Sequence, residues 1–197
     1  MIRYLVALGV LSGVTSAARA QHGGAAGAAT VAAPEARQFD FLVGQWELDV
    51  RPKGPGGLAE RIHGAPRLKG SWKAWRAFDG FGIEDELRII DESANPRSLT
   101  HTLRVYDPAA KRWSQTGLDV YRTRFASATA EWQGGEMRIT SRGTDAAGKT
   151  VLSRSRFYEI TPTGFRFQQD RSEDDGKTWT ENLIRITAKR VAATAPR

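Results

Sequence analysis

The sequence predicts an all-β protein that folds as a single antiparallel up-and-down β-barrel of about ten strands. Short runs with a period of two, rich in Trp, Phe, Ile and Val, follow one another from Phe39 onward, which is typical of strands that bury one face. Gly, Pro, Asn and Asp separate these runs and favour tight turns. No internal segment shows the spacing of a long amphipathic helix. Strands that follow one another through short turns favour one closed meander.

The turn signals divide the chain into its expected strands. Asn95-Pro96, Tyr106-Asp107-Pro108, Gln133-Gly134-Gly135 and residues 174–177 each carry turn-forming residues between two apolar runs. The strands predicted from these boundaries are 44–51, 68–78, 82–91, 99–107, 112–121, 124–133, 136–142, 150–160, 164–173 and 178–190.

The N-terminal part predicts export. Arg3 precedes an apolar run from Tyr4 to Val14, and Ala18-Arg19-Ala20 then offers the small-x-small pattern that signal peptidase reads. This run is shorter than the roughly 20 residues of a membrane span. We therefore predict a signal peptide over 1–20 and a periplasmic or secreted bacterial protein. Residues 21–37 are rich in Gly and Ala and predict a disordered lead, which leaves 38–193 as the barrel domain.

Composition restricts the chemistry. The chain has no Cys, which excludes disulfides, thiolate nucleophiles and Cys-ligated metal sites. The formal charge is +7, and cleavage of the signal peptide would remove two of these charges. Arg on the outer faces of strands explains this modest excess, so we expect no nucleic-acid partner. We also expect no integral membrane segment after cleavage, whereas the oligomeric state is left open.

Alternation along each strand assigns side chains to the two faces of the sheet. The inward set that we predict is Trp46, Leu48, Val50, Trp72, Phe78, Ile83, Leu87, Ile89, Leu99, Leu103, Val105, Met137, Ile139, Phe165 and Phe167. The arginines that we place outside are Arg104, Arg138, Arg154, Arg156 and Arg166.

Two segments resemble a secreted bacterial domain-of-unknown-function family, family 1579, which is similar to the calycins, the lipocalin and nitrobindin-like barrels. They are the F-D-F-L-V-G-Q-W segment at 39–46 and the acidic D-G-x-x-W hairpin that ends at Trp179. The resemblance implies a structural latch, in which Gly44 and Trp46 close the barrel base and a basic residue of the last strand stacks on the indole. Among Arg185, Lys189 and Arg190, parity favours Arg190.

Polar residues at inward positions are the candidates for a ligand site. By parity they are Asp85, His101, Ser153, Ser155, Gln169 and Arg171. They could orient a small apolar or amphipathic molecule, with Arg171 as a charged anchor. The alternative is an Asp85–Arg171 pair, with the remaining groups bonded to each other or to buried water.

Few residues of the sequence point to an enzyme or to a cofactor site. The three histidines are His22, His63 and His101; none has a second His at ligand spacing, so we expect no metal site. Nitrobindin-like barrels take their haem ligand from a strand near the C-terminal end, and no His follows His101, so we expect no cofactor. The sequence has no G-x-S-x-G, H-E-x-x-H or P-loop motif, so no catalytic residue is assigned.

Three functions follow, in order of preference. The first is a non-enzymatic barrel that binds a small molecule. The second is a filled barrel that acts as an envelope interaction module through surface tryptophans, for which Trp75, Trp113 and Trp132 are candidates. The third is a hydrolase or isomerase that uses His101 oriented by Asp85.

Overall fold

A computed structural model describes residues 31–192, apart from 55, 57–60, 62–63, 65 and 146–147. The predicted signal peptide, residues 21–30 of the predicted lead, His22 and His63 lie outside the described residues. None of the described helices is long and apolar enough to cross a membrane.

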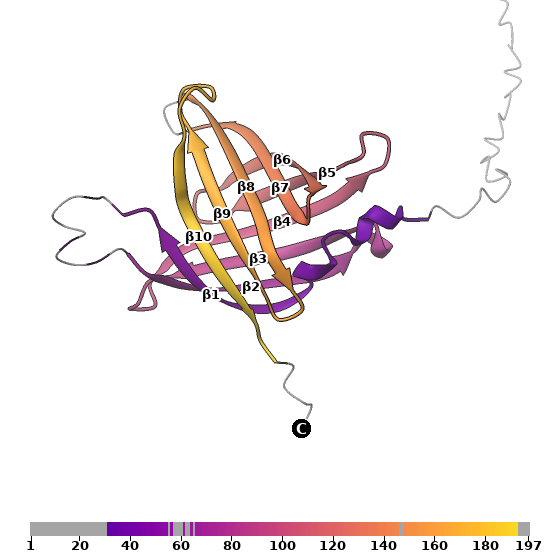
Figure 1. Cartoon of the computed structure of the whole chain (residues 1–197), viewed down its shortest axis with the longest axis horizontal. Helices are drawn as coiled ribbons and strands as arrows, with labels where there is room; N and C mark the ends of the chain where they lie inside the picture. The colour runs from indigo at the N-terminus through magenta and orange to yellow at the C-terminus, as the bar shows by residue number, and fades with distance from the viewer. Residues whose placement is uncertain are drawn as a thin grey trace, which may run out of the picture. The chain divides into compact units, whose positions relative to one another are not determined.

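Ten antiparallel strands form one closed barrel in which each strand pairs with the next and the last pairs with the first. Figure 1 shows this meander winding around a single interior. The predicted fold class is confirmed. The strands are β1 Gly44–Pro52, β2 Leu68–Ala77, β3 Gly82–Ile90, β4 Pro96–Asp107, β5 Arg112–Asp119, β6 Arg124–Gln133, β7 Glu136–Thr144, β8 Thr150–Thr161, β9 Gly164–Ser172 and β10 Thr180–Arg190.

Two short 3₁₀ helices precede the barrel, η1 at Pro34–Arg37 and η2 at Asp40–Leu42; a third, η3 at Phe78–Gly80, connects β2 to β3. Ala36 of η1 is buried, and Phe39, which precedes η2, and Leu42, which ends it, belong to the hydrophobic core. Pro34–Arg37 lies within the predicted disordered lead. There it forms the 3₁₀ turn η1, in which Ala36 is buried.

Aromatic rings fill the closed end of the barrel, where β1 begins and β10 ends. Phe39 packs edge-on against Trp113 with ring centres 4.8 Å apart, and Trp46 packs against Phe165 at the same distance. Such edge-to-face pairs add to the gain from burying large apolar area. The indole N–H of Trp46 donates to the Leu42 carbonyl at 2.7 Å, and that of Trp113 donates to Gln38 at 3.0 Å.

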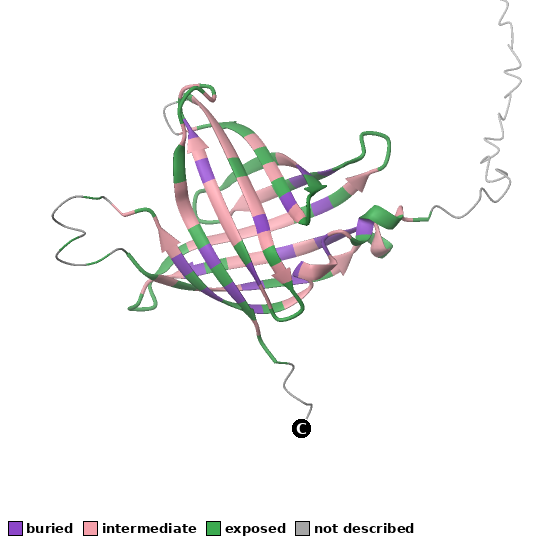
Figure 2. Ribbon diagram, in the orientation of Figure 1, coloured by how far each residue is buried: buried purple, intermediate pink, exposed green. Residues whose placement is uncertain are grey.

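The predicted faces hold on most strands but are reversed on β4. In Figure 2 buried and less buried positions alternate along the strands, as in β1, where Trp46, Leu48 and Val50 are all buried. On β4, however, Arg104 points inward and is only 4% exposed. The predicted inward positions of three apolar β4 residues are wrong, because they share the outward parity; these are Leu99, Leu103 and Val105.

The neighbouring strands explain why Arg104 points inward. Arg104 is the register partner of buried Ile83 on β3 and of buried Gln115 on β5. Its positive charge forms an ion pair with the Asp85 carboxylate in the barrel interior. Phe78 also departs from its predicted inward position. It lies in η3 and is 41% exposed.

Candidate functional site

A buried polar network crosses four adjacent strands near the closed end. Asp85 is 1% exposed and accepts two hydrogen bonds, from the Trp72 indole at 2.7 Å and from Nε of Arg104 at 2.8 Å. Arg104 also donates to Gln115, and its guanidinium lies over the Phe39 ring at 5.0 Å. A buried charge pair of this kind is tolerated because its hydrogen-bonding groups are used.

This network corrects the expected pairing of Asp85. Its partner is Arg104 on the adjacent strand β4, whereas Arg171 lies on β9 and contacts Glu173 instead. Both carboxylate oxygens of Asp85 are engaged within the core. Asp85 therefore acts as a structural group that holds Trp72 and Arg104 in place.

His101 lies on the outer face of β4, so its predicted inward position is also wrong. Its Nε2 is 3.5 Å from Glu84, and its ring centre is 5.8 Å from that of Trp75. Asp85 faces the interior, on the opposite side of the sheet. The two groups of the proposed hydrolase or isomerase site are thus separated by the sheet, and that alternative loses its geometric basis.

The other four predicted site residues lie together near the open end of the barrel, where β8 begins and β9 ends. Ser153 is the register partner of Arg171, and Ser155 is that of Gln169. All four are half-buried. Among the described residues, the side chains of Ser153, Ser155 and Gln169 make no hydrogen bond to protein. We refer to Ser153, Ser155, Gln169 and Arg171 as the mouth set.

Small side chains dominate the neighbouring wall of the mouth. Gly117, Ala128 and Ser141 occupy inward positions on β5, β6 and β7, whereas partly buried Leu87 and Ile184 lie on β3 and β10. Packing therefore changes along the barrel axis. Large aromatic side chains fill the closed end, and small or half-buried side chains line the mouth.

Among the described residues, Arg171 carries the one buried side-chain polar atom that has no hydrogen-bond partner. Its Nε is buried without a hydrogen-bond partner, although Nε lies 3.2 Å from a carboxylate oxygen of Glu173. That ion pair lacks hydrogen-bond geometry, and Glu173 is itself 57% exposed. An exposed ion pair contributes little, so the guanidinium retains donors for another acceptor.

At the closed end, the Arg190 guanidinium lies over the Trp46 ring, 4.0 Å from its centre. It donates to the carbonyls of Phe41, Val43 and Pro162. Gly44 has a φ of +127°, and any Cβ there would collide with this guanidinium. Among the three basic candidates of β10, Arg190 is thus the one that faces Trp46.

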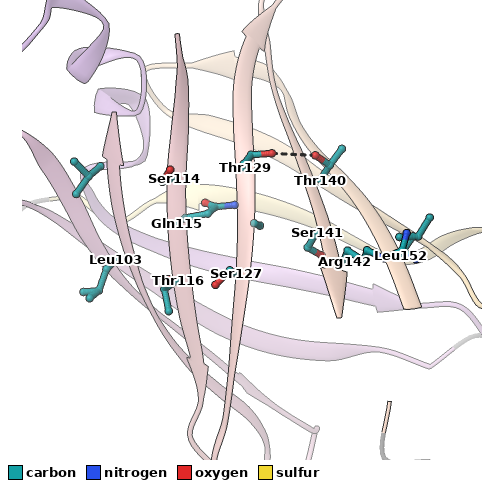
Figure 3. A pocket seen from close by; sticks show the side chains of 12 residues that line it. Leu103, Ser114, Gln115, Thr116, Ser127, Thr129, Thr140, Ser141, Arg142 and Leu152 are labelled. Atoms are coloured by element: carbon teal, nitrogen blue, oxygen red, sulfur yellow. Dashed lines mark hydrogen bonds between the residues drawn. The ribbon is translucent and has the colours of Figure 1, made fainter. Parts of the chain in front are cut away.

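A groove of about 780 Å³ lies outside the barrel, across β4 to β8. Figure 3 shows short hydroxyl side chains along its floor, with Leu103 at one side and Arg142 and Leu152 at the other. Alternation did not reveal this groove, because outward Ser and Thr are ordinary surface residues. The signal that it missed is the run of short outward side chains on three neighbouring strands.

The other predicted surface residues have mixed positions. Trp75 is 41% and Trp132 38% exposed, whereas Trp113 is fully buried, so the interaction module loses one of its three tryptophans. Within the described part of the chain, no group of three His, Asp or Glu residues is placed to hold a metal ion.

Comparison with known proteins supports the fold. No family model and no curated protein matches the chain. Among solved structures, the S-type phycobiliprotein lyase CPES from Guillardia theta matches with a TM-score of 0.54 and 10% identity, over 80% of this chain and 93% of the lyase. At this identity the likeness shows the fold alone. The chain thus has a calycin-like barrel fold, as its ten-stranded closed meander also indicates.

Proposed function

We propose that the barrel binds a small amphipathic molecule through its mouth and catalyses no reaction on it. The observation that carries this proposal is the buried Nε of Arg171, which among the described residues has an ion pair with Glu173 but no hydrogen-bond partner. Arg171 lies beside the half-buried Ser153, Ser155 and Gln169, whose side chains make no hydrogen bond within the part of the chain that the structure describes. Buried polar groups are normally satisfied, so a polar ligand group or water is expected there.

The chemistry of the mouth favours an acidic head group. A guanidinium binds a carboxylate with strong charge-assisted hydrogen bonds, and Ser153 and Gln169 can add further ones. The apolar part of the ligand would contact Leu87 and Ile184, which are only partly covered by the core. This combination of apolar walls with few polar groups is the usual composition of a ligand pocket.

We also propose that the chain is exported and belongs to family 1579. The basic start, the apolar run and Ala18-Arg19-Ala20 support export, and the segments that end at Trp46 and Trp179 support the family. The calycin-like fold of the lyase is compatible with a barrel that receives a small ligand.

Binding of dodecanoate and of neutral dodecanol, measured by calorimetry, tests the ligand proposal. The protein should bind dodecanoate more tightly than dodecanol, and Arg171→Gln should remove this preference by weakening dodecanoate binding about tenfold, or about 1.4 kcal/mol. Arg166→Gln is the matched control, because Arg166 lies on the same strand, points outward and is 53% exposed. Equal dodecanoate binding by Arg171→Gln and by the unmodified protein would contradict the proposal, as would no binding of either probe.

A further inference from the structure

The outer face of β4, β5 and β6 contains a band without Lys, Arg, Asp or Glu. Its outward positions are Leu99, His101, Leu103, Val105, Ser114, Thr116, Leu118, Phe125, Ser127 and Thr129, and Glu131, the next outward residue of β6, ends the band on that side. We call this band the neutral face. It is unusual in a chain of which 26% of residues are charged.

Large apolar side chains are exposed on the neutral face. Leu103 and Val105 are each 39% exposed, and Phe125 is 74% exposed. Trp75 on β2 is 41% exposed and lies beyond this face, across its register partner Glu84 on β3, with its ring centre 5.8 Å from that of His101. Contiguous exposed apolar groups of this size commonly mark an interface.

The face carries both a projection and a hollow. Phe125 projects from β6 two residues before Ser127, which lines the groove shown in Figure 3. Leu103 and Val105 form the groove's β4 side. A surface that presents both complementary shapes suits contact with a second copy of itself, because a two-fold interface uses the same patch twice.

Opposite charges flank the neutral face at the same height. Four residues on β3 to β6 are register partners in turn and so lie at one level. They are Glu84, Leu103, Thr116 and Ser127. On the other side, Arg142 on β7 follows Ser141, the partner of Ala128, and is therefore level with Ser127. Glu84 and Arg142 thus lie at one level on the two sides of the band.

We infer that two copies of this chain associate through the neutral face, around a two-fold axis that runs along β5. This axis places β4 of one copy against β6 of the other and β3 against β7. Glu84 of each copy then faces Arg142 of the other, and Phe125 packs against His101 and Leu103. The pairing of acidic and basic edges favours this orientation over others.

The existing contacts of the flanking charges do not oppose this arrangement. Glu84 lies 3.5 Å from His101, and Arg142 lies 2.9 Å from Asp175. Asp175 and Arg142 are each more than half exposed, so that pair contributes little and can be exchanged for a contact across the interface. The inference goes beyond ligand binding, and neither proposal depends on the other.

Sedimentation equilibrium over a range of protein concentrations tests the interface. The unmodified protein should form dimers, and Phe125→Asp should weaken the dimer on the order of tenfold or more, because a large exposed aromatic of the interface is replaced by a charge. Phe125 is highly exposed, so the variant should retain its melting temperature. Val191→Asp is the control, since Val191 is 38% exposed and lies beyond the end of β10.

Charge reversal tests the orientation. Glu84→Arg and Arg142→Glu should each be monomeric, because each places like charges together at two symmetric positions. A mixture of the two variants should form heterodimers, as both contacts then join opposite charges. A merely destabilised variant would not be rescued by mixing.

Three outcomes would overturn the inference. They are a protein that stays monomeric at every concentration, a dimer that Phe125→Asp leaves as tight as before, and reversal variants that fail to associate when mixed. A dimer that persists in all variants would show that another face is used.

Discussion

Trp46 and Arg190 are direct partners across β1 and β10, and the Arg190 guanidinium lies 4.0 Å from the centre of the Trp46 ring. The two residues stand 144 positions apart in the sequence, at the first and last strands. Their contact joins the seam at which the meander closes. Arg190 also donates hydrogen bonds to carbonyls in the segment before β1. One side chain therefore contacts both the β1–β10 pair and the segment that closes the barrel base.

Removal of this side chain should destabilise the fold. We expect Arg190→Ala to lower the free energy of unfolding by about 1 to 3 kcal/mol, because a cation–π contact and several hydrogen bonds to carbonyls are lost. Urea denaturation measures the change. Lys189→Ala is the control, since Lys189 is exposed and pairs with Glu47 on the outer face. Equal midpoints for Arg190→Ala and the unmodified protein would show that the latch adds no stability.

Substitution in the buried Asp85–Arg104 pair should lower stability more than substitution in a surface ion pair. Arg104→Met should cost about 3 to 5 kcal/mol, because it leaves the Asp85 carboxylate charged in the core. Arg122→Ala breaks an ion pair with Asp119 whose arginine is 54% exposed, and should change stability by no more than about 0.5 kcal/mol. Urea denaturation compares them. Equal losses would mean that the contact with Arg104 stabilises the fold no more than a surface ion pair does.

Some features of the barrel could be read from the sequence and others could not. Alternation placed Trp46 and Val50 inside because the other face of β1 carries Glu47, Asp49 and Arg51. Turn residues gave the strand limits for the same local reason. These features depend on the chain within a few residues.

The faces of β4 could not be obtained this way. Leu103 and Val105 look like core residues and Arg104 like a surface one, and only the register against Ile83 and Gln115 reverses this choice. That register is a property of neighbouring strands. The same holds for the candidate site: parity found the mouth set, but the exclusion of His101 and the engagement of Asp85 depend on partners from other strands.

Acid should loosen the hairpin between β9 and β10. Hydrogen bonds from the Thr178 hydroxyl and amide and from the Ser172 hydroxyl lower the pKa of Asp174 to about 2. The ionised form is thus favoured in the folded state, so its contribution is present above the ordinary value of 3.8 and is lost as the pH falls toward about 2.

The Asp174→Asn variant isolates this contribution. The variant lacks the stabilisation that the ionised Asp174 carboxylate provides. The difference in stability between the unmodified protein and the variant should therefore be constant above pH 4 and shrink below it. Thermal melting at several pH values measures this difference. Other carboxylates titrate in both proteins and cancel from the comparison. A difference that is independent of pH would show that Asp174 is not ionised in these hydrogen bonds.

Filling the mouth should separate a ligand barrel from a filled one. Ser155 is inward and half-buried, whereas Ala130 is 1% exposed and faces Trp113 in the packed end. If the mouth holds only water, the free energy of unfolding of Ser155→Leu should stay within about 0.5 kcal/mol of that of the unmodified protein. The leucine side chain should also weaken dodecanoate binding, because it occupies the site. Ala130→Leu should cost about 1 to 3 kcal/mol, because it overpacks a dense core. Urea denaturation and calorimetry give the two readouts. An equal loss of stability for both variants would mean that the mouth is as tightly packed as the base, and the filled-barrel alternative would then hold.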